Sequence, residues 1–239
     1  MDQITPWIDG PASHLLEAME RDVLLSLLEP RAGERFLEVG CGRGRRLSLL
    51  RRRGLTVTGL ETGTEAVAAA QKSLDNPSLV RLGRPTDLPF EDNSFEVVML
   101  GLARTRVDDL SAALAEAGRV ARRRVGVETI NPFSFLGLSL HLAGWDPLPK
   151  GVSPWRLRQS AREVYGSGRI KVQTLITFPR AWLTWLRGLE NSVLVQRMWF
   201  GGLVFLAVDL RYIVRTKPLA APAKPARAAP GCGPMSREG

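Results

Sequence analysis

The first 30 residues contain an apolar pattern with helical spacing. Within residues 13–28, the apolar side chains fall at positions 15, 16, 19, 23, 24, 27 and 28, which places them on one face of a helix. Ser13 is a favourable N-cap residue, and Pro30 cannot continue a helix. The sequence therefore predicts an amphipathic helix over residues 13–28.

Strand and helix patterns then alternate as far as residue 130. Short apolar runs, typical of buried strands, are separated by segments with helical spacing. We expect strands near 35–40, 56–61, 79–82, 96–100 and 125–130, and helices near 45–53, 64–74 and 107–121. Such alternation predicts an α/β fold with a doubly wound, mostly parallel sheet and helices on both faces.

The pattern becomes less regular after residue 130. Residues 131–155 are rich in Pro, Gly and Trp, and we expect them to be irregular. The expected elements beyond them are a helix near 154–165, a strand near 169–178, a Trp-rich helix near 179–190 and a long strand near 201–214. We expect one domain over 1–217, made of an N-terminal arm and helix (1–30), a ligand-binding core (31–130) and a covering half (131–217), followed by a disordered tail (218–239).

Composition narrows the class of protein. With 239 residues, of which 44% are hydrophobic and 24% charged, the chain can bury a full core, which excludes wholesale disorder and collagen-like repeats. Its two cysteines, Cys41 and Cys232, can assemble neither a disulfide framework nor a zinc cluster. The chain opens without a basic and apolar leader, and its longest apolar run (203–208) is far shorter than a membrane span, so we expect a cytoplasmic protein.

The formal charge of +9 is unevenly distributed. Residues 131–239 hold 15 basic and 5 acidic side chains, which leaves open an RNA- or anionic-membrane-binding function for this half. Arginine supplies 28 of the 33 basic residues, a bias that genome composition also produces. The arginines of 43–46 and 51–53 alternate with leucines, and we interpret them as the solvated face of a helix. We expect no obligate nucleic-acid partner, while peripheral membrane contact and the oligomeric state stay open.

A glycine-rich segment lies where the first strand turns into the next helix. It reads Glu38-Val-Gly40-Cys-Gly42-Arg-Gly44, and glycines there permit a tight turn and close approach of a ligand to the backbone. Glu61 ends the second strand, where a carboxylate can accept both hydroxyl groups of a ribose. The spacing is G-x-G-x-G with an acid before it, not the dinucleotide pattern G-x-G-x-x-G. Because Glu38 would repel a pyrophosphate but attract an ammonium, the loop favours a nucleoside with an amino-acid end over NAD.

Four motifs together resemble those of class I S-adenosylmethionine-dependent methyltransferases, in particular the small-molecule group with an L-P-F-x-D-x-S-F signature. They are Leu37-Glu-Val-Gly-Cys-Gly-Arg-Gly44, Val57-Thr-Gly-Leu-Glu61, Asp87-Leu-Pro-Phe-Glu-Asp-Asn-Ser-Phe95 and Glu116-Ala-Gly-Arg-Val120. The resemblance covers residues 7–130, since Trp7-Ile-Asp-Gly10 is similar to the arm that covers the cofactor. It implies a Rossmann-like sheet with an antiparallel final strand and C-terminal insertions. It also implies methyl transfer from S-adenosylmethionine to a small molecule, for which a hydrophobic or anionic compound suits this composition best.

The same resemblance implies roles for individual residues. Gly40, Gly42 and Gly44 would line the methionine part of the cofactor, Glu38 would lie near its ammonium, and Glu61 would hold the ribose. The other cofactor contacts that it implies are Cys41, Thr62, Thr86, Asp87, Leu88, Leu100 and Gly101. It implies no metal ligand.

Two departures from the family pattern stand out. Where the family has Asp-Ala before x-x-L-P-F, this chain has Arg84-Pro85, and arginine cannot accept a hydrogen bond from adenine while proline has no N–H to donate. Thr86 or Asp87 would have to replace these contacts, and a non-catalytic or altered-ligand relative is the alternative. The usual Pro-Gly-Gly turn is also missing, because residues 120–125 run directly from helix to strand.

No catalytic residue stands out. His14 and His141 are weak candidates for a general base, although a lone histidine more often packs or faces solvent. Asn131 opens an Asn-Pro-Phe segment that is similar to an amino-group methyltransferase element, but it follows the wrong strand and is better explained as a turn cap. All six tryptophans lie outside 36–130; with Phe133, Phe135 and Phe178 they would either cover the acceptor or pack the accessory helices.

Overall fold

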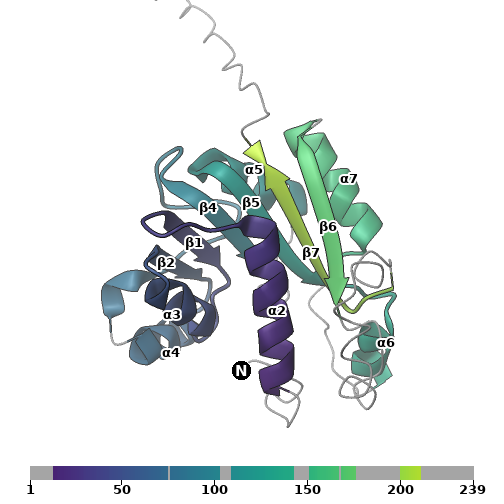
Figure 1. Cartoon of the computed structure of the whole chain (residues 1–239), viewed down its shortest axis with the longest axis horizontal. Coiled ribbons are helices and arrows are strands. Elements are labelled where there is room, and N and C mark those ends of the chain that lie inside the picture. Colours follow the sequence, from purple (N-terminus) through teal and green to yellow (C-terminus); the bar gives the residue numbers. More distant parts are fainter. Residues whose placement is uncertain are drawn as a thin grey trace, which may run out of the picture.

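The computed structural model describes residues 13–74, 76–102, 109–142, 151–166, 168–175 and 200–210. These residues form a seven-stranded sheet with the strand order β3-β2-β1-β4-β5-β7-β6 (Figure 1). The strands are β1 (Arg35–Val39), β2 (Thr56–Glu61), β3 (Val80–Leu82), β4 (Phe95–Gly101), β5 (Ala121–Ile130), β6 (Arg169–Leu175) and β7 (Leu203–Asp209). Only β7 runs antiparallel to its neighbours, β5 and β6, so the predicted fold class is confirmed.

Helices cover both faces of the sheet. The described helices are α2 (Ser13–Leu28), α3 (Arg45–Arg52), α4 (Thr64–Leu74), α5 (Leu110–Val120), α6 (Phe135–Leu142) and α7 (Pro154–Tyr165), with a short 3-10 helix, η1 (Pro77–Leu79), before β3. Apolar side chains of α2, α3 and α4 share one buried core with one face of the strands, whereas those of α5 and α7 belong to a second core on the other face. This is the doubly wound arrangement that the alternating pattern predicts.

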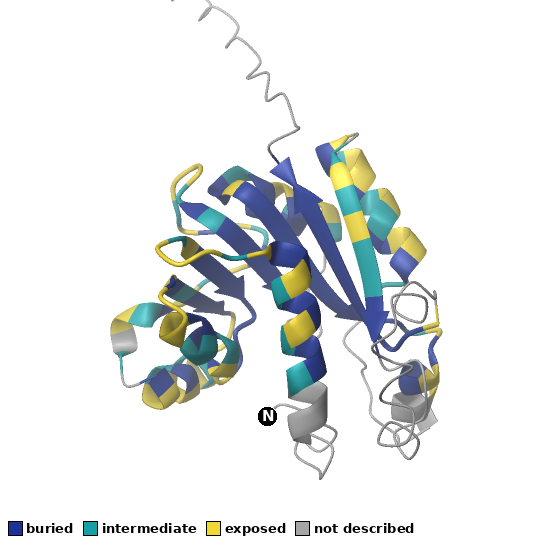
Figure 2. Ribbon diagram, viewed as in Figure 1, coloured by how far each residue is buried: buried dark blue, intermediate teal, exposed yellow. Residues whose placement is uncertain are grey.

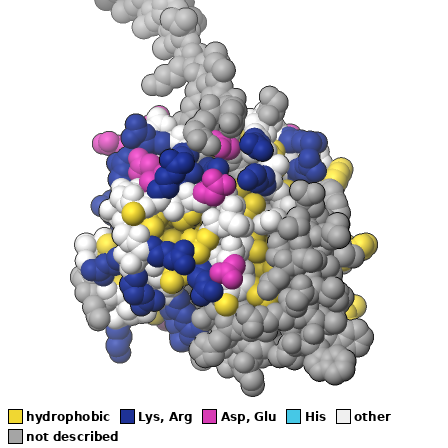
Figure 3. Space-filling model, in the orientation of Figure 1, with side chains coloured by type: hydrophobic (Ala, Val, Ile, Leu, Met, Phe, Trp, Pro, Cys, Tyr) yellow, Lys and Arg dark blue, Asp and Glu magenta, His cyan; other side chains and the backbone are white. Residues whose placement is uncertain are grey.

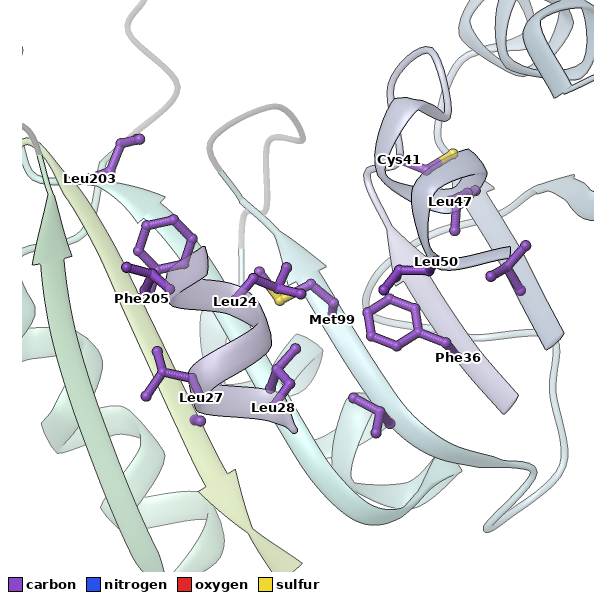
Figure 4. Close-up of a cluster of buried hydrophobic side chains, with 14 of the residues drawn as sticks. Leu24, Leu27, Leu28, Phe36, Cys41, Leu47, Leu50, Met99, Leu203 and Phe205 are labelled. Carbon is purple, nitrogen blue, oxygen red and sulfur yellow. The ribbon is translucent and has the colours of Figure 1, made fainter. Parts of the chain in front are cut away.

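Helix α2 lies against the side of the sheet formed by β5, β7 and β6. Its leucines at 24, 27 and 28 reach the same buried layer as Phe36, Met99 and Phe205 (Figure 4). The approach is close at Gly126 of β5, because a Cβ there would lie 2.7 Å from the Met99 sulfur and 2.8 Å from a Leu28 methyl carbon. Gly126 therefore allows α2 to pack against β5 without displacing either side chain.

The apolar run near the C-terminus forms the inner of the two last strands. Every residue of β7 is buried, whereas β6 at the sheet edge keeps exposed and half-buried positions (Figure 2). Of the expected strand over 201–214, residues 203–209 are extended and 211–214 lie outside the described residues. No helix in the described part of the chain is long and apolar enough to span a membrane.

Two expectations need correction. Strand β5 begins at Ala121 rather than 125, and the side chains of Arg123 and Arg124 are buried at its start. Helix α6 occupies part of a stretch that was expected to be irregular. Its first turn is capped by the Ser134 hydroxyl, which accepts a hydrogen bond from the Gly137 N–H at 2.9 Å.

Several predictions fall outside the described residues. The Trp-rich helix near 179–190 and the tail over 218–239 are among them, as are the last part of the strand near 169–178 and the arm at 7–10. His14 and His141 lie within α2 and α6, but their side chains are not described. The division of the chain into arm, core and covering half stays a prediction.

Candidate functional site

The glycine loop between β1 and α3 has the backbone geometry that its sequence predicts. Gly40, Gly42 and Gly44 have φ values of 78°, 54° and 72°, in the left-handed region that strongly favours glycine. The Gly40 N–H donates to the Leu60 carbonyl at 2.8 Å, and the Gly44 N–H donates to the Cys41 carbonyl at 2.9 Å. The loop is thus a tight turn fastened to the end of β2.

Glu61 lies against this loop at the carboxyl end of β2. Its buried carboxylate accepts hydrogen bonds from the N–H of Gly42 and, at 3.3 Å, from the N–H of Thr62. The end of β4 approaches from the other side, because a Cβ on Gly101 would lie only 3.0 Å from the Gly40 carbonyl oxygen. The loop, Glu61 and the Leu100–Gly101 end of β4 therefore meet at one edge of the sheet, where ligands bind in open α/β folds.

Cys41 belongs to the core rather than to an open site. Its side chain is buried, and Figure 4 shows it beside Leu47 of α3. A Cβ on Gly59 would lie 2.7 Å from the Cys41 sulfur, so the thiol fills the space that this glycine leaves on β2. Cys41 can contact a ligand only through its backbone.

The segment after β3 forms a turn over the next strand end. The Asp87 N–H donates to the Arg84 carbonyl at 3.2 Å, with Pro85 buried at the second turn position and Arg84 exposed. The segment adjoins β2, because the Gly83 N–H donates to the Glu61 carbonyl at 2.9 Å. Thr86 is half-buried in this turn, which begins one residue after the contact of Gly83 with Glu61.

Helix α5 fastens the following residues through its Glu-Ala-Gly-Arg motif. The Glu116 carboxylate accepts from the Leu88 N–H at 2.9 Å, and Arg119 donates to the carbonyls of Leu88 and Phe90 at 3.0 and 2.8 Å. Arg119 also binds Glu116, and this hydrogen bond lowers the pKa of the Glu116 carboxyl below its usual value. The motif thus holds the loop after β3 in place, and the Leu88 amide is engaged by protein rather than turned to an open site.

Arg46 is the second residue of α3 and lies at the centre of a buried network of charged side chains, which we name the Arg46 network. Its guanidinium lies 2.6 Å from the Glu128 carboxylate of β5, 3.1 Å from Glu38 of β1 and 3.9 Å from Glu20 of α2. At most 11% of each of these side chains is exposed. Burial alone would lower the pKa of Arg46, but the three carboxylates together raise it, so the guanidinium is charged.

This network corrects the interpretation of residues 43–46 as a solvated face. Arg43 and Arg45 are exposed as expected, whereas Arg46 points inward. Arg46 and its partners Glu20 and Glu128 were not recognised as site residues from the sequence. One signal was available: Glu128 is a charged residue inside the apolar strand Val-Gly-Val-Glu-Thr-Ile, and a buried charge needs a partner.

Asn131 caps the turn after β5, as predicted from the sequence. Its side-chain amide donates to the Gly201 carbonyl at 3.2 Å, and its side-chain oxygen accepts from the Phe133 N–H at 3.1 Å. Its side chain is thereby used to join the end of β5 to the start of β7. These contacts favour the turn-cap interpretation of Asn131 over a catalytic one.

Exposed aromatic side chains surround this end of β5. Ile130 pairs with Leu203, so residues just after β5 and just before β7 share one edge of the sheet. The start of α7 reaches the same edge, because the Val152 N–H donates to the Thr129 hydroxyl at 3.3 Å. The aromatic side chains exposed here, which we name the aromatic rim, are Phe133, Phe135, Trp155 and Phe200.

Basic side chains on the described surface are interspersed with acidic ones, as the upper part of Figure 3 shows. Arg35 lies 3.0 Å from Glu96, and Arg119 lies 2.9 Å from Asp92. Such pairing reduces the field that would attract a polyanion. The high arginine content of the chain is therefore a weak argument for nucleic-acid binding.

Comparison with known proteins agrees with this geometry. Residues 37–125 match the family model described as a methyltransferase domain. The chain is 37% identical over 107 residues to nocamycin O-methyltransferase of Saccharothrix syringae, covering 41% of this chain and 38% of that protein. It is 33% identical over 135 residues to malonyl-[acyl-carrier protein] O-methyltransferase of Erwinia billingiae, covering 56% and 52%. The matches thus span about half or less of these relatives.

The solved structures extend the similarity to most of the fold. An S-adenosylmethionine-dependent methyltransferase of Mesorhizobium loti superposes with a TM-score of 0.61 at 16% identity, covering 84% of this chain and 99% of that one. At this identity the superposition supports the fold alone. With the family match over residues 37–125 and the motif positions, it shows that this chain is similar to class I S-adenosylmethionine-dependent methyltransferases.

Proposed function

We propose that this protein transfers a methyl group from S-adenosylmethionine to a small-molecule acceptor. The proposal rests mainly on one observation. The glycine loop, whose glycines have left-handed φ values, contacts the buried Glu61 carboxylate at the edge of the sheet where the parallel strands have their carboxyl ends. Glycine backbone, a carboxylate at the end of β2 and an acid before the loop are the groups that an amino-acid-bearing adenosine requires. The described residues therefore fit the family's cofactor.

Each part of the cofactor has a proposed partner. The loop over Gly40–Gly44 would line the methionine part, with Glu38 on the ammonium side, and Glu61 would accept the ribose hydroxyls. A carboxylate can accept about four hydrogen bonds, so ordering the loop and binding a sugar are compatible roles. The adenine would lie between the turn that carries Thr86 and the Leu100–Gly101 end of β4.

The reaction requires little acid–base chemistry from the protein. The cofactor supplies an electrophilic methyl group, whose bond to sulfur breaks as the acceptor's lone pair forms the new bond. The chain's task is to hold the acceptor in line with that methyl group and to exclude water. For this reason the proposal does not depend on His14, His141 or Asn131.

The aromatic rim supports a hydrophobic acceptor. Apolar and aromatic walls favour ligands with apolar surface, and the rim lies at the same edge of the sheet as the glycine loop. The names of two relatives, nocamycin O-methyltransferase and malonyl-[acyl-carrier protein] O-methyltransferase, are compatible with an organic or anionic acceptor that is methylated on oxygen. We therefore propose a hydrophobic or anionic small molecule.

Calorimetry with S-adenosylmethionine and S-adenosylhomocysteine tests the proposal first. We expect saturable binding of both, followed by methyl transfer to at least one compound in a panel of hydrophobic carboxylic acids, phenols and enols, detected by mass spectrometry. Absence of binding by the folded protein at millimolar ligand would overturn the proposal and favour a relative with an altered ligand.

A further inference from the structure

The Arg46 network lies on both flanks of the glycine loop. Glu38 is two residues before Gly40, and Arg46 is two residues after Gly44. Glu128 reaches the same guanidinium from β5, at 2.6 Å. The network is therefore part of the wall beside the proposed methionine-binding loop, although the sequence motifs point only to Glu38.

Glu128 is close to the loop because of a glycine on the strand between them. Glu128 is paired in register with Gly101 of β4, and a Cβ on Gly101 would lie 3.0 Å from the Gly40 carbonyl. Since Gly101 has no side chain, nothing from that position separates Glu128 from the loop. The Glu128 side chain is only 3% exposed, so water screens its charge weakly.

Among the described residues, the network contains three carboxylates around one guanidinium. A carboxylate beside the loop favours a ligand with more positive charge. The methyl donor carries a positive sulfonium, whereas the product of transfer, S-adenosylhomocysteine, has a neutral thioether in its place. Both ligands carry the ammonium. Glu38 is proposed to act on the ammonium alone, and such a residue does not distinguish donor from product.

We propose that the Arg46 network sets the preference of the cofactor pocket for donor over product, with Glu128 as the specificity-determining residue. The inference rests on the proposed function. Replacing the Glu128 carboxylate by an amide removes one negative charge beside the loop and keeps the side-chain size. Donor affinity should then fall more than product affinity.

The experiment measures the dissociation constants of S-adenosylmethionine and S-adenosylhomocysteine by calorimetry in wild type and variants. In Glu128→Gln we expect the ratio of product to donor dissociation constants to fall about threefold or more, because one weakly screened negative charge beside the loop is lost. Glu20→Gln, which removes another carboxylate of the network, should shift the ratio in the same direction. Arg46→Gln, which removes a positive charge, should shift it in the opposite direction.

Glu34→Gln is the matched control. Glu34 is also a poorly exposed, ion-paired glutamate, 2.7 Å from Arg123, but it precedes β1 at the opposite edge of the sheet. Its variant should leave the ratio unchanged.

A purely structural network would weaken donor and product binding by equal factors. An unchanged ratio in Glu128→Gln would therefore overturn this inference while leaving the proposed function intact. Should Glu128→Gln not fold, an unchanged ratio in Glu20→Gln together with Arg46→Gln would overturn it equally. If wild type binds neither ligand, the proposed function itself fails.

Discussion

The carboxylate of Glu61 has two roles that a substitution can separate. It accepts hydrogen bonds from the backbone N–H groups of Gly42 and Thr62, and we propose that it also accepts the ribose hydroxyls. Charge-assisted hydrogen bonds of this kind are worth roughly 1.5–3 kcal/mol each. Glu61→Ala should therefore weaken S-adenosylmethionine affinity on the order of 10- to 100-fold, as measured by calorimetry.

Glu61→Gln is the control for that prediction. The amide keeps an oxygen that can accept from Gly42 but loses the negative charge and one acceptor oxygen. Reduced affinity in both variants would indicate that the ligand contacts the carboxylate. Equal affinity in wild type and both variants would show that no ligand lies across the end of β2.

Arg84 and Pro85 form one of the two departures from the methyltransferase pattern. Arg84 is exposed and Pro85 is buried in the turn. The Arg84 side chain has no acceptor and Pro85 has no N–H, so the usual pair of contacts to adenine is missing. An unpaired polar edge costs about 1–3 kcal/mol. Restoring the family pair with Arg84→Asp and Pro85→Ala should tighten S-adenosylmethionine binding about tenfold.

Pro85→Ala alone is the matched control, since it restores the backbone N–H without the acceptor. The double variant should bind more tightly than this control when both are titrated by calorimetry. Unchanged or weaker binding in the double variant would mean that the turn recognises the base through another contact, which would favour an altered ligand.

At the scale of elements, the start of β5 holds the C-terminal end of α2. Arg123 donates to the carbonyls of Leu28 and Glu29 at 3.3 and 3.1 Å and binds Glu34 at 2.7 Å. Arg124 donates to the Leu27 carbonyl at 3.0 Å. Cations near the last carbonyls of a helix stabilise it, so these arginines replace the family's turn with a contact that docks α2.

Arg123→Met should therefore lower the free energy of unfolding by about 2–4 kcal/mol, since it removes the donor to the buried Leu28 carbonyl and the partly buried contacts with Glu29 and Glu34. Arg122→Met is the control: Arg122 is adjacent but its side chain is 58% exposed, so its variant should change stability by less than about 1 kcal/mol. Urea denaturation measures both, and hydrogen exchange in the last turn of α2 should rise in Arg123→Met alone. Equal effects of the two substitutions would contradict the docking role.

The elements that could be predicted from sequence are those whose pattern is local. The apolar spacing of 13–28, the glycines of the loop and the acid that ends β2 each depend on nearby residues, and all three lie where expected. Arg46 was misinterpreted and the role of Arg123 was not predicted, because their partners lie far away in the chain: Glu128 is 82 residues from Arg46, and Leu28 is 95 residues from Arg123. Periodicity places a charged residue on a surface by default, and only the tertiary fold brings its partner to it.

At the scale of the whole molecule, the excess of basic residues coexists with extensive ion pairing. Carboxylates on separate elements each hold an arginine: Glu29 after α2 binds Arg124, and Glu96 on β4 binds Arg35. The ion pairs thus connect segments that are distant in sequence. Their integrity depends on the carboxylates being ionised, so the stability of the fold is coupled to pH.

The sign of this coupling follows from the pKa values. A hydrogen bond from Arg35 lowers the pKa of Glu96 to about 2, and hydrogen bonds from Arg124 and Arg119 lower the pKa of Glu29 and Glu116 below the usual value of 4.5 for a glutamate. A carboxyl whose folded pKa is depressed stabilises the fold above its unfolded pKa. That contribution is lost as pH falls through the unfolded pKa near 4.5 toward the folded one.

Stability should therefore be nearly constant between pH 7 and 6 and should decline from about pH 5 toward pH 3, as measured by the free energy of unfolding in urea at each pH. The Glu96–Arg35 pair should account for on the order of 1–2 kcal/mol of this decline, because partial solvent exposure reduces the effect of the full shift. Glu96→Gln removes the titrating group, so its stability should be lower at pH 7 and should fall less steeply below pH 5. Parallel curves for wild type and Glu96→Gln would show that the acid sensitivity arises elsewhere in the ion-pair network.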